Sequence, residues 1–140
     1  FHRILPDGAK AKLAKAKDIK RVVLCSGKVY YDLFEEREKR GIDTVVLLRI
    51  EQFYPFPSKV LAEELAEYQN AEIVWCQEEP KNHGAWSFVD PLIEEVLAEV
   101  KTKSTRPKYI GRPAASSPAT GHLRRHNAEQ AQLLDDVLTV

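Results

Sequence analysis

The stretch EIVWCQEEPKNHGAW, residues 72–86, decides the fold. Its first five residues form an apolar, β-prone run that ends at Cys76, where carboxylates, a proline, a cation, an amide and an imidazole follow. Gly84 and Trp86 then lead into a segment with helical apolar spacing. In open α/β sheets, ligands and partners lie where strands end in such polar loops. We therefore expect residues 77–85 to form a loop at the carboxyl edge of a sheet.

The same strand-to-helix rhythm extends in both directions from this stretch. Continuous apolar runs predict buried strands at 21–25, 44–50, 72–76 and 108–111. A helix is expected from Val29 to Gly41, and another after Ser58, which we interpret as its N-cap. A third helix must place Pro91 in its first turn, because proline is tolerated only there. Ala131, Leu134 and Leu138 mark a closing helix.

Alternating strands and helices predict one α/β domain with a mostly parallel sheet between two helix layers. The length suits a single domain over residues 1–140, with the α/β core at 21–140. Residues 1–5 are a candidate edge strand, and residues 9–20 form a lysine-rich linker or solvated helix, with an anion-binding tail as the alternative. The chain lacks methionine, so we interpret it as a piece of a longer polypeptide.

Charge and cysteine content narrow the class of protein. The net charge is zero, so no basic field points to nucleic acid, and no apolar run has the length of a membrane span. Cys25 and Cys76 each end an apolar strand and lack the spacing of metal ligands. We expect both to be free, buried thiols in a reducing compartment rather than a disulfide.

One candidate anion site follows from strand ends. Ser26 and Lys28 follow one strand, Arg49 ends a second, and Lys81 and Asn82 follow a third, so all should lie along one edge of the sheet. A helix amino terminus after Gly27 adds partial positive charge there. These cations require neutralisation, either by internal carboxylates or by a bound phosphate group. The candidate carboxylates are Glu51, Glu78 and Glu79.

Other candidate sites are weaker. Glu78 and Glu79 are adjacent and should point apart, which disfavours an acid–base pair. His83 stands in the loop, and His122 and His126 are four residues apart, but no partner set suits a metal. We predict no catalytic residue and no metal ligand in this chain.

Tyr54, Pro80 and Trp86 have the aromatic character of contact surfaces, and we predict that they form an exposed interface cluster. The alternative is that Trp86 packs on its own helix.

Four ordered blocks resemble the C-terminal domain of the thiamine-diphosphate-dependent 2-oxoglutarate dehydrogenase subunit, a domain type shared with transketolase. These blocks are RVVLCSGKVYYDL (21–33), RIEQFYPFP (49–57), WCQEEPKNHGAW (75–86) and YIGRPAASSPATG (109–121). The resemblance implies a five-stranded mixed sheet in a three-layer α/β/α fold, with one antiparallel edge strand that residues 1–5 would supply.

The resemblance also implies a function for the whole subunit. Such a subunit decarboxylates 2-oxoglutarate on thiamine diphosphate and magnesium, which preceding domains bind, and succinylates the lipoyl group of a second component in the citric acid cycle. It implies a homodimer in the bacterial cytoplasm or, less expected, the mitochondrial matrix. This chain would be an assembly domain that is inactive alone; the alternative is a regulatory domain that binds acetyl-coenzyme A or a nucleotide. An independent flavodoxin-like carrier is disfavoured, because the chain lacks a flavin phosphate loop.

Overall fold

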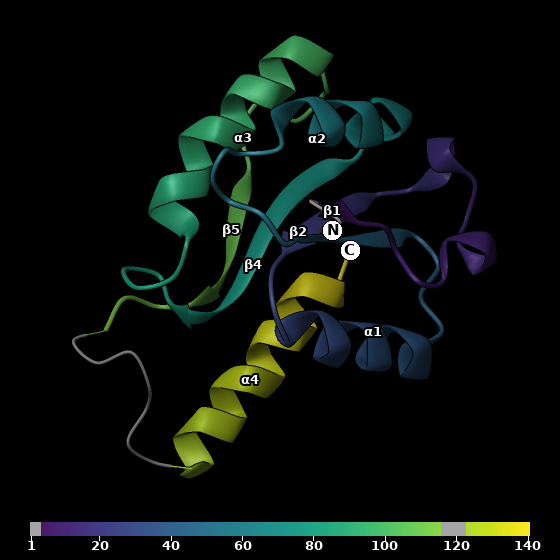
Figure 1. Ribbon diagram of the computed structural model, residues 1–140. Coiled ribbons are helices and arrows are strands. Elements are labelled where there is room, and N and C mark those ends of the chain that lie inside the picture. The colour runs from purple at the N-terminus through teal and green to yellow at the C-terminus, as the bar shows by residue number, and fades with distance from the viewer. Residues whose placement is uncertain (1–3, 116–122) are drawn as a thin grey trace.

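The computed structural model describes residues 4–115 and 123–140 (Figure 1). The strands are β1 (Ile4–Leu5), β2 (Arg21–Cys25), β3 (Val45–Ile50), β4 (Glu72–Pro80) and β5 (Lys108–Arg112). The α-helices are α1 (Val29–Arg40), α2 (Ser58–Leu65), α3 (Trp86–Val100) and α4 (Leu123–Leu138). Short 3-10 turns occupy η1 (Lys10–Lys12), η2 (Ala16–Asp18) and η3 (Ala66–Tyr68).

The five strands form one sheet in the order β1-β3-β2-β4-β5. Strands β2, β3, β4 and β5 run parallel, whereas β1 pairs antiparallel with β3 through Ile4 opposite Ile50. This arrangement confirms the mostly parallel sheet and the antiparallel edge strand that the sequence predicted. From β2 the chain passes to β3, which lies toward one edge of the sheet. From β4 it passes to β5, which lies at the other edge. The order therefore reverses between β2 and β4, which makes their carboxyl ends the topological switch point of the sheet.

Two helix layers cover the sheet (Figure 1). Helices α2 and α3 cover one face, and α1 and α4 cover the other. Alternate residues of β2 point to opposite layers, as strand geometry requires: Val22 and Leu24 pack with α2 and α3, and Val23 and Cys25 pack with α1 and α4. Every residue of β2 is buried, which is why its sequence is continuously apolar after Arg21.

Strand β4 continues to Pro80, four residues beyond the predicted end at Cys76. Its polar extension still pairs with β5, through Gln77 opposite Gly111, and a register shift between Gln77 and Pro80 accommodates the bend. The prediction failed because hydrophobicity marks burial, whereas ladder pairing needs only backbone groups. The loop at this edge is therefore shorter than the sequence suggested.

Two predicted helix features are wrong, the N-cap of α2 and the place of Pro91, whereas α4 confirms the closing helix. The N-cap of α2 is Pro57, without a side-chain cap, and Ser58 is already the first helical residue. Helix α3 begins at Trp86, so Pro91 lies in its second turn instead of its first. Helix α4 buries Leu133, Val137 and Leu138, while Leu134 is half-buried and Ala131 is exposed.

The amino-terminal segment joins the sheet through β1 and then crosses to the start of β2. Residues 9–20 contain the two short turns η1 and η2 rather than one helix, in agreement with a linker. Among residues 4–115 and 123–140, no helix has the length and apolar character needed to cross a membrane.

Candidate functional site

The structure separates the cations that the sequence placed along the carboxyl edge. The ammonium of Lys28 lies 3.4 Å from a carboxylate oxygen of Glu78. Arg49 lies 3.7 Å from Glu51, and Lys81 lies over the ring of Tyr109, 5.4 Å from its centroid. Lys28 and Arg49 thus have internal carboxylate partners, as the first of the two sequence hypotheses requires.

Arg49 contacts two neighbouring aromatic rings. Its guanidinium carbon lies 4.5 Å from the ring centroid of Tyr30 and 5.0 Å from that of Tyr31. Its Nη1 also donates a hydrogen bond to the Tyr31 hydroxyl at 2.9 Å. Stacking of this kind suits a planar guanidinium and orients it rigidly. This role of Arg49 was not predicted, although two adjacent tyrosines, Tyr30 and Tyr31, follow closely after the Gly27-Lys28 turn in the sequence.

Gln77 is the organising residue of the loop that follows β4. Its side chain is buried, and its Oε1 accepts hydrogen bonds from the Trp75 indole (2.9 Å) and the Trp86 backbone N–H (3.1 Å). Its Nε2 donates to the carbonyls of Glu79 (3.1 Å) and Pro80 (2.9 Å). All four hydrogen-bonding positions of the amide are therefore used. Gln77 fixes the bend of β4 and the start of α3 together.

A cavity of about 310 Å³ opens at the topological switch point. It contains Ser26 from the predicted anion site but none of the predicted cations. Its aromatic wall is formed by Phe53 and Trp75, whose ring centroids are 6.2 Å apart. The residues that line it are Ser26, Gly27, Phe53, Trp75, Gln77, Glu79, Gly84 and Ala85.

A polar network joins the carboxyl ends of β4 and β5 to α1 and α4. Gln130 donates to Asp32 (3.1 Å) and Glu78 (3.2 Å), and it accepts from the buried Arg112 (2.9 Å). Arg112 also donates to Nδ1 of His126 at 2.9 Å, since a guanidinium has no acceptor. Glu78 thus contacts both Gln130 and Lys28 within the domain.

The remaining predicted loop residues, Asn82 and His83, contact Ala115 in the segment that follows β5. Asn82 donates to the carbonyl of Ala115 (2.8 Å) and accepts from its N–H (2.9 Å), and His83 Nε2 lies 3.0 Å from the same carbonyl. In residues 4–115 and 123–140 no group of three metal-ligating side chains occurs; His122 lies outside these ranges.

The predicted interface cluster is only partly exposed. Tyr54 is 86% exposed, but Pro80 is buried, contrary to the prediction. Trp86 is half-buried, and its ring centroid lies 5.3 Å from that of Tyr109. Burial raises the pKa of the Tyr109 hydroxyl to about 12. Trp86 thus packs against Tyr109 of β5, whereas the alternative had placed it on its own helix.

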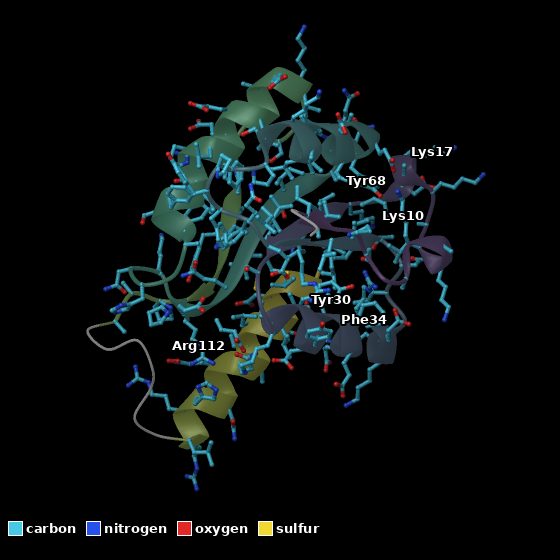
Figure 2. All side chains as sticks on the ribbon, viewed as in Figure 1. Lys10, Lys17, Tyr30, Phe34, Tyr68 and Arg112 are labelled. Atoms are coloured by element: carbon cyan, nitrogen blue, oxygen red, sulfur yellow. The ribbon has the colours of Figure 1, made fainter. Side chains whose placement is uncertain are left out.

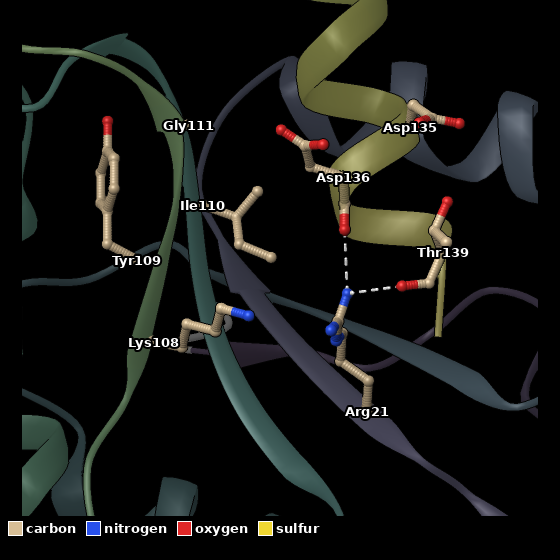
Figure 3. A pocket seen from close by; sticks show the side chains of 8 residues that line it. All are labelled: Arg21, Lys108, Tyr109, Ile110, Gly111, Asp135, Asp136 and Thr139. Carbon is tan, nitrogen blue, oxygen red and sulfur yellow. Dashed lines mark hydrogen bonds between the residues drawn. The ribbon is translucent and has the colours of Figure 1, made fainter.

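A second cavity, of about 480 Å³, lies at the opposite, amino edge (Figure 3). Arg21 dominates it, and its Nη1 donates to the carbonyls of Asp136 (3.0 Å), Val137 (2.8 Å) and Thr139 (3.5 Å). Its Nε donates to Glu72 at 2.8 Å. A cation at the carboxyl terminus of a helix satisfies its free carbonyls. Arg21 therefore caps α4.

Comparison with known proteins decides the family. The model of the family described as "2-oxoglutarate dehydrogenase C-terminal" matches residues 1–138. This chain belongs to that family. Proteins named "2-oxoglutarate dehydrogenase E1 component" from Brucella abortus strain S19, Brucella anthropi and Brucella suis are each 60% identical over 144 residues. The match covers 99% of this chain but 14% of each relative, so the chain spans about one seventh of their length.

Membership in this family confirms the resemblance stated on the four sequence blocks. The mixed five-stranded sheet agrees with the fold that the resemblance implied.

Proposed function

We propose that this chain is the C-terminal assembly domain of the E1 component of a 2-oxoglutarate dehydrogenase complex. The complete subunit oxidatively decarboxylates 2-oxoglutarate and transfers the succinyl group to the lipoyl-bearing second component in the citric acid cycle. The observation that carries this proposal is 60% identity to the Brucella abortus E1 component over 99% of the chain.

In this proposal the chemistry belongs to parts of the subunit beyond these residues. Thiamine diphosphate with magnesium supplies the carbanion-stabilising chemistry, and the protein supplies orientation. The described residues contain no three-ligand metal cluster, and the polar groups at the carboxyl edge bind one another. These contacts among the polar groups support a structural role for this domain. We place the subunit in the bacterial cytoplasm, which suits its two free, buried cysteines.

The assembly role is supported by where large apolar side chains are exposed. Among the described residues five large apolar side chains are exposed. Four of them follow carboxyl ends of parallel strands, in the first turns of α1, α3 and α4 and in the loop after β3: Tyr31, Tyr54, Phe88 and Leu123. The fifth is Val140, after α4. Exposed large apolar groups that gather at one end of a domain are typical of a contact surface. We call these four residues the carboxyl-edge apolar set, and we propose that it packs in the homodimer of the complete subunit.

A domain graft tests the proposal. In the Brucella abortus E1 component, the segment that aligns with this chain is replaced by this chain. We expect the chimera to remain a dimer and to decarboxylate 2-oxoglutarate with thiamine diphosphate, magnesium and ferricyanide as electron acceptor. A deletion that removes the segment is expected to be inactive, and so is the isolated chain, which has no Gly-Asp-Gly diphosphate motif. A soluble, dimeric but inactive chimera would contradict the proposal.

The cavity at the switch point favours a second candidate, a regulatory ligand site. Ser26 lines it beside the amino terminus of α1, a position that suits an anionic group. This candidate predicts that acetyl-coenzyme A or a nucleotide binds the chimera and binds more weakly after Ser26→Ala, because Ser26 is the predicted anion-site residue that lines the cavity. Titration calorimetry that shows no heat at millimolar ligand would leave only the internal ion pairs.

A further inference from the structure

Positive charge is concentrated in the segment from Ala9 to Lys20, far from the carboxyl edge. The segment contains five lysines and one aspartate, a net charge of +4, in a chain whose net charge is zero, so the rest of the chain carries −4. The lysines are Lys10, Lys12, Lys15, Lys17 and Lys20.

The segment is an ordered scaffold rather than a free tail. The Ala14 N–H donates to the Asp43 carbonyl at 2.8 Å, and the Lys20 N–H donates to the Thr44 carbonyl at 2.8 Å. Ile19 is buried, and Leu13 packs against the core between the sheet and α2. The apolar side chains thus face the domain. The lysine side chains remain outside, and Figure 2 shows Lys17 extending away from the ribbon.

Most of this charge has no counterpart in the described structure. Lys10 pairs with Glu67 at 3.3 Å. Lys12, Lys15, Lys17 and Lys20 are exposed and have no ion-pair partner within residues 4–115 and 123–140. Lys103 adds a further cation, because it lines a cavity of about 320 Å³ together with Lys20. Glu72 lines this cavity too, but its carboxylate pairs with Arg21 at 2.6 Å. A fixed cluster of like charges repels itself, and an opposite charge from outside relieves that repulsion.

The types of side chain in residues 9–20 favour a protein as the partner. Protein surfaces that bind single-stranded nucleic acid use arginine and aromatic side chains to stack on the bases, and residues 9–20 contain neither. They also expose no large apolar side chain of the kind that inserts into a lipid surface. Lysines displayed as point charges on a fixed backbone suit carboxylates on a protein.

We propose that residues 9–20 form a docking face for an acidic protein surface, with Lys12, Lys15, Lys17 and Lys20 as the contacting groups. Solvent-exposed pairs of this kind contribute mainly to association rate and orientation, and they weaken with salt. The face lies at the amino edge, so it is independent of the carboxyl-edge apolar set and of the proposed dimer.

Fluorescence anisotropy with labelled poly-L-glutamate tests the docking face on this chain. The variant K12Q/K15Q/K17Q is compared with K39Q/K59Q/K108Q, which removes three exposed lysines from α1, α2 and β5. We expect the wild type and the control to bind at low salt, and the first variant to bind about tenfold more weakly. K12R/K15R/K17R should restore binding, which excludes misfolding as the cause.

Two results would overturn the proposal. Equal weakening in the control variant would show that net charge alone acts. Tighter binding of single-stranded DNA or of anionic phospholipid vesicles than of poly-L-glutamate would show that the partner class is wrong. Either result leaves the graft experiment unaffected, because the graft is read out through decarboxylation.

Discussion

Asp7 and Arg37 form a bidentate ion pair with side chains that are 1% and 0% exposed. The Asp7 carboxylate also accepts the N–H groups of Ala9 (2.9 Å) and Leu47 (2.8 Å), and Arg37 donates to the Val45 carbonyl at 3.0 Å. The pair therefore joins the turn after β1 to α1 and β3. Through it the amino-terminal segment becomes part of the folded domain.

Removal of Asp7 leaves the buried Arg37 with only the half-exposed Glu38, 3.5 Å away, as a counter-charge. We expect Asp7→Ala to lower the free energy of unfolding by about 3–5 kcal/mol, measured by urea denaturation. Asp18→Ala is the matched control, since Asp18 is exposed in the same segment, and it should change stability by less than about 0.5 kcal/mol.

Replacement of both partners separates burial from charge. The double variant Asp7→Leu/Arg37→Met should be more stable than Asp7→Ala, because no unpaired charge remains in the interior. Equal stability of the two variants would show that shape and backbone contacts, not the uncompensated charge, dominate.

Gly84 is required by its contact with Gln77. A Cβ at position 84 would lie 2.8 Å from the Cδ, Nε2 and Oε1 atoms of Gln77. That amide cannot move without loss of its bonds to Trp75 and Trp86. We expect Gly84→Ala to destabilise the domain by about 1–3 kcal/mol, the usual cost of overpacking. Tryptophan fluorescence during urea unfolding measures it, and a midpoint equal to that of wild type would exclude the clash.

The buried strands and the order of the helices were predictable, because they depend on local patterns. Arg21 to Cys25 is continuously apolar after its first residue, and Gly41, at φ +66°, ends α1 where a left-handed residue was expected. The polar end of β4 was not predictable, since Gln77 and Glu78 read as loop. Their strand conformation depends on pairing with β5, more than thirty residues away.

The positions of the predicted cations in the fold could be derived from the sequence, but the partners of their side chains could not. Lys28, Arg49 and Lys81 do follow or end parallel strands. Their partners come from distant elements or from aromatic neighbours, and sequence spacing does not show which carboxylate each cation reaches. Gln77 was missed because a glutamine between a cysteine and two glutamates has no distinctive pattern.

Two buried thiols make the domain sensitive to alkaline pH. Burial raises the pKa of Cys25 to about 12 and holds that of Cys76 well above its usual value. In the unfolded chain both thiols ionise near pH 8.5, so above that pH the unfolded state binds fewer protons than the folded state. The stability that these two thiols contribute is therefore expected to be present in full below about pH 8.5 and to be lost as the pH rises toward 12.

We expect the free energy of unfolding to fall between pH 8 and pH 10.5, on the order of 1.4 kcal/mol per pH unit for each ionising thiol. In Cys25→Ala/Cys76→Ala the stability at neutral pH should be lower, because two buried side chains are shortened, but its decline with pH should be shallower. Equal pH slopes for the two proteins would assign the alkaline effect to other groups.

Tyr54 and Trp86 distinguish a contact between subunits from packing within the domain. Tyr54 is 86% exposed, whereas Trp86 packs on Tyr109 and its backbone is bound by Gln77. In the isolated chain, Tyr54→Ala should leave the melting temperature unchanged, and Trp86→Ala should lower it, because only the second change removes an internal contact.

In the Brucella chimera, Tyr54→Ala should raise the concentration at which the dimer dissociates, measured by analytical ultracentrifugation, because an exposed tyrosine stabilises an interface only when a partner covers it. Ser87→Ala, which alters an exposed residue at the start of α3 outside the carboxyl-edge apolar set, is the control. A chimera whose dimer dissociates at the same concentration with Tyr54 and without it would remove Tyr54 from the proposed interface.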